Sequence, residues 1–210
     1  HRKAVYRKNQ ETFKKLKMIT GIFNKDIIKI LTLFSVSPGS KFTRNEIKEK
    51  TMLNNVPLDN ATNILLNNRI LIKEKRLLSL NFKNKNAKIL LDIAKGEYSR
   101  FKEIPLKVYY LLMDVSVVLS GIKNVIRVCL FGSYAKLIYT DRSDIDLAVV
   151  LEKENRDVIG KIKRDVNKIE RKYNKSLEPH FFKREDMRQK DPIMKEISRN
   201  NVELFSKEFV

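Results

Sequence analysis

The strongest constraint in this 210-residue chain is a pair of carboxylates that follows one apolar run and precedes another. Residues 125–131 are rich in apolar and β-branched side chains, which predicts a buried strand, and they end abruptly in Gly132-Ser133. Ten residues separate Ser133 from Asp144, and Asp146 opens the second apolar run. Side chains two residues apart on a strand share one face. The sequence therefore predicts two strands with an acidic site near their ends.

The residue types in this segment suit phosphate and metal chemistry. Glycine removes the side chain where a backbone must approach a ligand closely, and Ser133 adds a hydroxyl and an amide. Backbone amides at the start of a helix form a site for anions. Neighbouring carboxylates raise each other's pKa unless a cation joins them, and hard oxygen ligands suit Mg²⁺. A phosphate cradle beside such a metal site is typical of phosphoryl or nucleotidyl transfer.

Gly-Ser, a ten-residue spacer and Asp-x-Asp together resemble the minimal nucleotidyltransferases of the DNA polymerase β superfamily. In haloacid-dehalogenase-type enzymes the apolar strand precedes the acids, whereas here it follows them. The resemblance covers about residues 122–210. It implies that Gly132 and Ser133 hold the phosphates of a nucleotide, while Asp144 and Asp146 ligate Mg²⁺. The spacing is similar to that of the antitoxin branch that pairs with HEPN-domain toxins and transfers AMP to the toxin.

Two positions after the Gly-Ser pair depart from the family pattern. Many relatives have Arg and then Gly where this chain has Lys136 and Leu137. Lys136 is expected to meet a phosphate as a point charge rather than as a planar fork. Leu137 makes the loop less flexible than glycine would.

The superfamily often places a third carboxylate on a later strand, as general base and ligand of a second metal. Residues 175–182 predict a strand with Glu178 and His180 on one face, and Glu178 is the only acid in it. Glu178 is therefore the expected third acid. The alternative is a surface glutamate on an edge strand, which Pro179 favours. His180 would assist the site or simply pack, and Cys129 is expected in the core.

The first part of the chain predicts three short helices followed by a basic hairpin. Helical spacing predicts helices over residues 25–35 and from about 58 to 68, and Thr43 with Glu46 predicts a capping box that opens a helix between them. Residues 70–80 predict a β-hairpin around a charged turn. This order resembles a winged helix-turn-helix, in which the third helix enters the major groove of DNA. The alternative is a winged helix used for dimerisation or protein docking.

The expected DNA contacts follow from position in that fold. Charge supports a polyanion as partner, because the chain carries a net charge of +19 and residues 1–100 hold 22 basic against 8 acidic side chains, or +14. Solvated charges in a lysine-rich chain are the alternative. The polar side chains of the third helix are candidates for contacts to base edges, namely Asn60, Thr62, Asn63 and Asn67. The cations of the hairpin are candidates for contacts to phosphates, namely Lys73, Lys75 and Arg76.

Together these patterns predict an α+β protein with two modules. A basic N-terminal helix and the winged helix-turn-helix would occupy residues 1–83, and two linking helices with a break at residues 96–99 would occupy 84–121. A small mixed-sheet nucleotidyltransferase domain flanked by helices would occupy 122–210. Within it, helices are expected over 155–174 and over 184–197, the latter broken at Pro192, and a final strand over 202–205.

The expected function is Mg²⁺-dependent transfer of a nucleoside monophosphate, most simply AMP from ATP, to a hydroxyl acceptor, such as one on a HEPN-type toxin. The alternative, which Leu137 favours, is a DNA-binding regulator whose second domain only binds nucleotide or mediates assembly. RNA modification is a third hypothesis. The chain has a single cysteine and no secretory signal, which predicts a cytoplasmic protein. Asp114 lies within the most apolar window, which argues against a membrane span. That window, residues 104–122, is also the surface that would form a homodimer.

Overall fold

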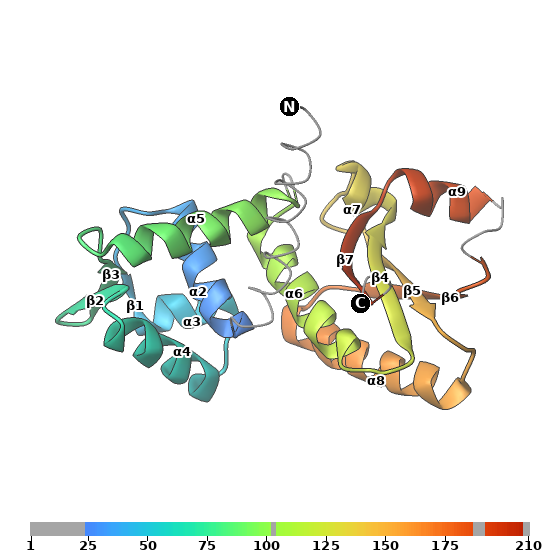
Figure 1. The fold of residues 1–210 in the computed structure, drawn as a ribbon, viewed down its shortest axis with the longest axis horizontal. Helices are drawn as coiled ribbons and strands as arrows, with labels where there is room; N and C mark the ends of the chain where they lie inside the picture. The colour runs from blue at the N-terminus through green and yellow to red at the C-terminus, as the bar shows by residue number, and fades with distance from the viewer. Residues whose placement is uncertain (1–23, 102–103, 187–191, 208–210) are drawn as a thin grey trace, which may run out of the picture. The chain divides into compact units, whose positions relative to one another are not determined.

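The computed structural model describes residues 24–101, 104–186 and 192–207. The chain divides between Tyr98 and Ser99 into two compact units (Figure 1). The basic helix expected near the N-terminus lies outside the described residues.

The first unit contains four helices and three short strands among its described residues. The strands form one antiparallel sheet in the order β1-β3-β2, and β2 and β3 form the predicted hairpin. The elements are α2 Lys25–Val36, β1 Phe42–Thr43, α3 Arg44–Thr51, α4 Asn55–Asn67, β2 Leu71–Glu74, β3 Leu77–Leu80 and α5 Lys85–Ser99. Helix α4 begins three residues earlier than predicted. Pro57 therefore lies in its first turn, where a missing amide hydrogen costs no intrahelical bond.

The turn from α3 to α4 is fixed by local hydrogen bonds. The predicted capping box is present, because the Glu46 amide donates to Thr43 Oγ1 (3.3 Å) and the Thr43 amide donates to Glu46 Oε2 (2.6 Å). Arg44 donates from Nε and Nη2 to the two carboxylate oxygens of Asp59 (2.6 and 2.9 Å), which joins the first turn of α3 to α4. The same bonds hold the pKa of Asp59 below its usual range.

The second unit is built on a four-stranded mixed sheet, as predicted. The strand order is β6-β5-β4-β7; β5 and β6 are parallel and the other two pairs are antiparallel. Parallel neighbours need a long crossover, which α8 supplies. The elements are α6 Leu106–Ser120, β4 Val125–Phe131, α7 Gly132–Lys136, β5 Ile145–Leu151, α8 Arg156–Tyr173, β6 Leu177–Lys183, α9 Pro192–Arg199 and β7 Val202–Ser206.

Helices cover the two faces of this sheet in different ways (Figure 1). Helices α6 and α8 pack against each other and against the sheet on one face. Helix α9 lies on the other face, where Met194 and Ile197 pack with Cys129, Phe131 and Ala148. Because side chains alternate along a strand, Asp146 shares the α9 face with Ala148. The buried Cys129 belongs to the core, as predicted, and burial raises the pKa of its thiol to about 11.

The helix break predicted at residues 96–99 is wrong. These residues form the last turn of α5, and the break falls between Ser99 and the start of α6. Gly96 is exposed, and a Cβ there would meet no atom within 4 Å. Glycine at such a position costs a helix only about 1 kcal/mol, so it does not end one.

The apolar window at residues 104–122 is mostly used inside the second unit. Helix α6 buries eight of its side chains, and Val117 and Val118 stay exposed at 49% and 37%. None of the helices in the described ranges has the length and apolar character of a membrane span. Helix α6 is tied to α8 by the buried Asp114, whose Oδ2 accepts hydrogen bonds from Lys172 Nζ (2.7 Å) and Tyr173 Oη (2.8 Å).

We predict that Asp114→Ala lowers the free energy of unfolding by about 2 kcal/mol, because it removes the carboxylate that accepts from the Lys172 ammonium and one of the two acceptors of the Tyr173 hydroxyl. Chemical unfolding followed by circular dichroism measures this change. Asp165→Ala is the matched control on α8, since Asp165 pairs only with the exposed Lys161 and Lys168 among the residues described. It should change the free energy by about 0.5 kcal/mol or less. Equal losses in the two variants would contradict the prediction.

Candidate active site

The Gly-Ser pair marks the point where β4 ends and α7 begins. Gly132 has a φ of +68°, a conformation that side-chain-bearing residues rarely adopt. A Cβ at this position would overlap the carboxylate of Asp146 on β5, with its Cγ only 2.8 Å away. The sequence pattern predicted close approach of a ligand at this glycine. The structure adds that the backbone here also makes room for a carboxylate of the neighbouring strand.

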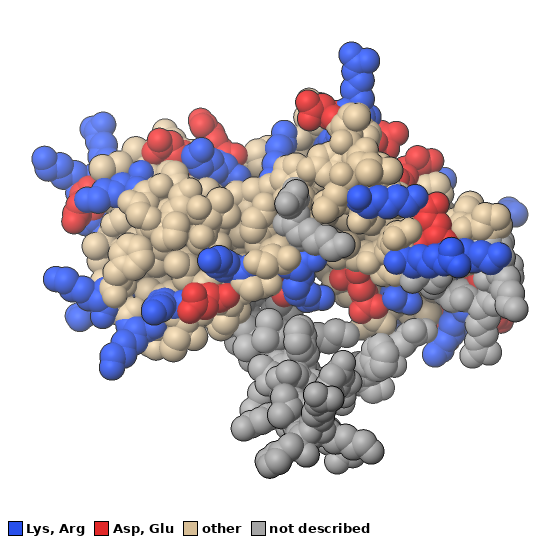
Figure 2. Space-filling model, turned by 90° about the horizontal axis from the view of Figure 1, so that it is seen from above, with Lys and Arg blue, Asp and Glu red and all other residues tan. Residues whose placement is uncertain are grey.

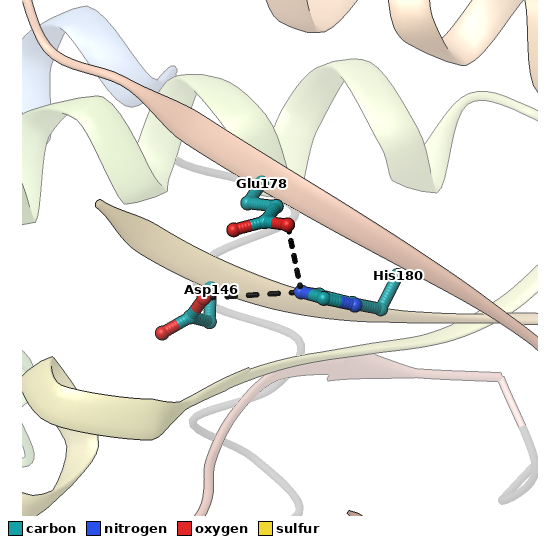
Figure 3. Close-up of side chains that lie close together, drawn as sticks. All are labelled: Asp146, Glu178 and His180. Atoms are coloured by element: carbon teal, nitrogen blue, oxygen red, sulfur yellow. Dashed lines mark ion pairs between the residues drawn. The ribbon is translucent and has the colours of Figure 1, made fainter.

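A second carboxylate and an imidazole reach Asp146 from β6. In the parallel pair, Asp146 lies opposite Glu178, and Ala148 lies opposite His180. Figure 3 shows the three polar side chains pointing toward one another from the two strands. His180 Nε2 is 3.8 Å from Asp146 Oδ1 and 3.8 Å from Glu178 Oε1. These separations are too long for hydrogen bonds. The three residues each offer a ligand atom, and these atoms all lie within 4.8 Å of one another.

Negative charge is concentrated around Asp146. Partial burial raises the pKa of its carboxyl above the usual range, and the charges of Glu178, Asp144 and Glu196 raise it further, while His180 acts in the opposite direction. A bound cation would relieve this repulsion. Electrostatics and donor types therefore both suit a divalent metal ion.

Asp144 lies at the rim of this group. It precedes β5, is exposed, and does not belong to the three residues whose ligand atoms come together. Its charge still reaches Asp146, as the pKa of Asp146 shows. The structure thus brings Asp146 and Glu178 together and leaves Asp144 beside them.

The segment after Gly132 forms one short helix. Ser133 is half-buried in its first turn, and its carbonyl accepts hydrogen bonds from the amides of Leu137 and Ile138. Leu137 ends the helix in the left-handed region with a φ of +58°. Glycine adopts this conformation without the strain of about 1–2 kcal/mol that other residues bear. The departure from the family pattern therefore falls on a position where backbone geometry favours glycine.

Two charged side chains link this helix to α9. Lys136 Nζ forms an ion pair with Glu196, and Glu196 is close enough to Asp146 to raise its pKa. Lys136 thus belongs to the edge of the acidic site. No sequence pattern identified Glu196, because α9 carries no motif. Glu196 is also far along the chain from the Asp-x-Asp pair, so no local spacing indicates that the two are close.

His180 is oriented by its apolar neighbours. Its ring meets Phe131 edge-on, with ring centroids 5.2 Å apart and an interplanar angle of 72°. The small side chain of Ala148 lies opposite it on β5. The sequence left open whether this residue assists the site or packs. In the structure the ring packs on Phe131, and Nε2 faces two carboxylates.

The residues expected to contact DNA lie in the first unit, and one of them is misplaced. Thr62 is 7% exposed and lies on the buried face of α4, so it cannot reach a base edge and that prediction is wrong. Its neighbours Ala61 and Leu65 define that face. The other six candidates are exposed, namely Asn60, Asn63 and Asn67 on α4 and Lys73, Lys75 and Arg76 on the hairpin.

The segment that contains this site matches a known protein family. Residues 114–209 match the nucleotidyltransferase domain of the polymerase beta family. The match begins eight residues before the boundary that the sequence predicted, within α6, and it includes the whole acidic site.

A solved structure also resembles part of the chain. It is that of a candidate nucleotidyltransferase from Sulfolobus solfataricus, with 20% sequence identity over 49% of this chain and 86% of that one. The TM-score of 0.33 lies below the level at which two folds are regarded as the same. A search of curated proteins gives no match.

We predict that Gly132→Ala destabilises the second unit by about 1–3 kcal/mol, since alanine is strained at this φ and its Cβ displaces the Asp146 carboxylate. Gly160→Ala on α8 is the matched control. Its Cβ would lie 3.5 Å from Arg164 Nη1, an ordinary contact, and the change favours the helix by about 1 kcal/mol. Thermal unfolding of both variants measures the difference, and a Gly132→Ala variant as stable as the wild type would refute the role given to this glycine.

Proposed function

We propose that the second unit transfers a nucleoside monophosphate, most simply AMP from ATP, to a hydroxyl acceptor in a reaction that depends on Mg²⁺. The observation that carries the proposal is the meeting of Asp146 and Glu178 beside Gly132-Ser133, within the segment matched by the family model.

The residues present fit a divalent cation. Asp146 and Glu178 supply hard oxygen donors within reach of one another, and Asp144 adds a third carboxylate at the rim. Partial burial raises the pKa of Asp146, and the charges of Glu178, Asp144 and Glu196 add to that rise. A cation would balance these neighbouring negative charges. When bound, Mg²⁺ would neutralise phosphate charge and stabilise the charge that develops during transfer.

The other residues have roles that follow from their positions. The amides of Gly132 and Ser133 would hold phosphate oxygens, and Lys136 would add a positive charge at the same edge. Glu178 is 59% exposed at its side chain, so an acceptor can approach it. It would take the proton of the acceptor hydroxyl as that oxygen bonds to the α-phosphorus and pyrophosphate leaves.

The acceptor we propose is a hydroxyl on a protein, such as a HEPN-type toxin. The support is analogy, because minimal versions of this fold lack the large domains that position a template or a tRNA end.

We predict that protein incubated with Mg²⁺ and ATP labelled at the α-phosphate transfers label to an acceptor in a cell lysate. Asp144→Asn/Asp146→Asn, and separately Glu178→Gln, should each reduce transfer at least about 100-fold, the scale of one missing catalytic acid or base. Asp141→Asn, an exposed aspartate in the same loop, should leave transfer unchanged. Parallel reactions with labelled GTP, CTP and UTP identify the preferred base.

The outcomes separate the two main hypotheses. Label that persists in the double variant would place the chemistry elsewhere. No label with measurable nucleotide binding would favour the regulator, whose second domain binds nucleotide without turnover.

We further propose that the first unit is a winged helix-turn-helix that binds DNA. Its element order supports this, as does a hairpin whose cations have no ion-pair partner among the described residues: Lys73, Lys75 and Arg76. Lys75 occupies the two-residue turn with a φ of +56°, at the exposed tip. On the face drawn in Figure 2, cationic and acidic side chains are interspersed between broad uncharged areas, so the hairpin is a more specific candidate than that face.

We predict that DNA affinity falls steeply with salt. Replacing Lys73, Lys75 and Arg76 by alanine should make the negative slope of log K against log salt shallower by about 2.7, since each phosphate that is no longer neutralised accounts for about 0.9. Fluorescence anisotropy with labelled duplex DNA measures the slope. Replacing Lys161, Lys163 and Lys168 of α8 by alanine removes the same charge from the second unit and should leave the slope unchanged. An equal change in both variants would show that binding depends only on net charge.

A further inference from the structure

The acidic site contains one donor that a pure Mg²⁺ site does not need. His180 Nε2 points between Asp146 and Glu178 at 3.8 Å from an oxygen of each (Figure 3). Mg²⁺ prefers oxygen ligands, whereas imidazole is a ligand of zinc, cobalt, nickel, copper and iron. The donor set of the site is therefore two carboxylates and one imidazole.

The geometry suits a shared ion. Two ligand atoms that each lie about 2.1 Å from one ion are about 3.0 Å apart at an octahedral angle and about 3.4 Å apart at a tetrahedral angle. The two separations of 3.8 Å from His180 exceed these values by less than about 1 Å, and all three ligand atoms lie within 4.8 Å of one another. Side-chain rotation would have to draw the two carboxylates and the imidazole together around the ion. The side chains are 24%, 59% and 34% exposed for Asp146, Glu178 and His180, so an ion can enter from solvent.

The surroundings hold the imidazole in this position. The edge-on contact with Phe131 fixes the ring, and Ala148 on the facing strand is too small to displace it. Strand register brings Glu178 opposite Asp146, and the absence of a side chain at Gly132 leaves space for the Asp146 carboxylate. The three donors are thus positioned by separate features of the fold.

We propose that His180 is a metal ligand, and that with Asp146 and Glu178 it makes the site select first-row transition-metal dications over Mg²⁺ more strongly than three carboxylates would. This inference rests on the proposed metal-dependent function, which it deepens by naming the class of ion. An all-oxygen site also binds transition metals more tightly than Mg²⁺, so the informative quantity is the ratio of the two affinities.

The test measures metal binding to the full chain in the absence of nucleotide. Calorimetry gives the dissociation constants for Co²⁺ and Mg²⁺, and Co²⁺ absorption reports whether nitrogen is bound. His180→Phe keeps a ring against Phe131 but removes the donor, and His180→Asp supplies a third carboxylate instead. The sequence has only one other histidine, so His1→Asn is the matched control. Circular dichroism establishes that each variant is folded.

We expect the ratio of the Mg²⁺ to the Co²⁺ dissociation constant to fall about tenfold or more in His180→Phe and in His180→Asp, and to stay unchanged in His1→Asn. The Co²⁺ spectrum should change only in the two His180 variants. An unchanged ratio in His180→Phe would overturn the proposal and leave His180 as a packing residue. Absence of Co²⁺ binding to the wild-type chain would overturn it as well.

Failure of this inference and failure of the proposed function are distinguishable. If the protein binds Co²⁺ through His180 but transfers no label, the proposed metal site stands and the proposed transferase function is wrong. If the protein transfers label with Mg²⁺, and the ratio of its Mg²⁺ to Co²⁺ dissociation constants does not depend on His180, the proposed function stands and the inference about His180 is wrong.

Discussion

The chemistry of the second unit depends on one close approach, that of the Asp146 carboxylate to the backbone of Gly132. The two strands are hydrogen-bonded neighbours, and Phe131 pairs directly with Asp146. The backbone of Gly132 consequently lies beside a carboxylate that a cation can neutralise. A side chain at position 132 would occupy the space of that carboxylate and separate the groups suited to phosphate from those suited to metal. Glycine here is thus a geometric requirement of the site, and the positive φ of its backbone is a second reason for it.

Features encoded within about ten residues were predictable from the sequence. The capping box of Thr43 and Glu46 depends on two side chains and the amides next to them, and it forms as expected. The strands on either side of the Gly-Ser and Asp-x-Asp motifs are also as predicted, because their runs of apolar residues are long and bounded by polar ones. The sequence predicted that Glu178 and His180 share one face of a strand, and the family resemblance implied that Glu178 is the third acid of the site. The register that pairs Glu178 with Asp146 depends on how α8 returns the chain to the sheet, which no local pattern specifies.

Most of the misplaced or missing residues share one cause, which is tertiary packing. Thr62 is polar, yet α4 turns it toward the core, because helix periodicity and not polarity decides which side chains are buried. Gly96 is a separate case without packed neighbours, and it continues a helix because glycine there costs only about 1 kcal/mol. Glu196 joins the site from a helix that follows the motifs by some fifty residues, and His180 acquires its orientation from a ring on β4. Whether such a side chain packs or binds is decided by neighbours that the sequence does not bring together.

The position of β6 at the edge of the sheet links the site to the register of this strand. Among the described residues β6 is an edge strand, held by backbone pairing only to β5, and Pro179 within it has no amide hydrogen to contribute. A slip of one residue along β5 would turn Glu178 and His180 to the opposite face of the sheet. An ion held between Asp146 and the β6 ligands would bind the aligned strand and not the slipped one, and so would stabilise the alignment by its own binding free energy. Metal binding and the equilibrium between the aligned and the slipped edge strand would then be linked, so a change in one would change the other.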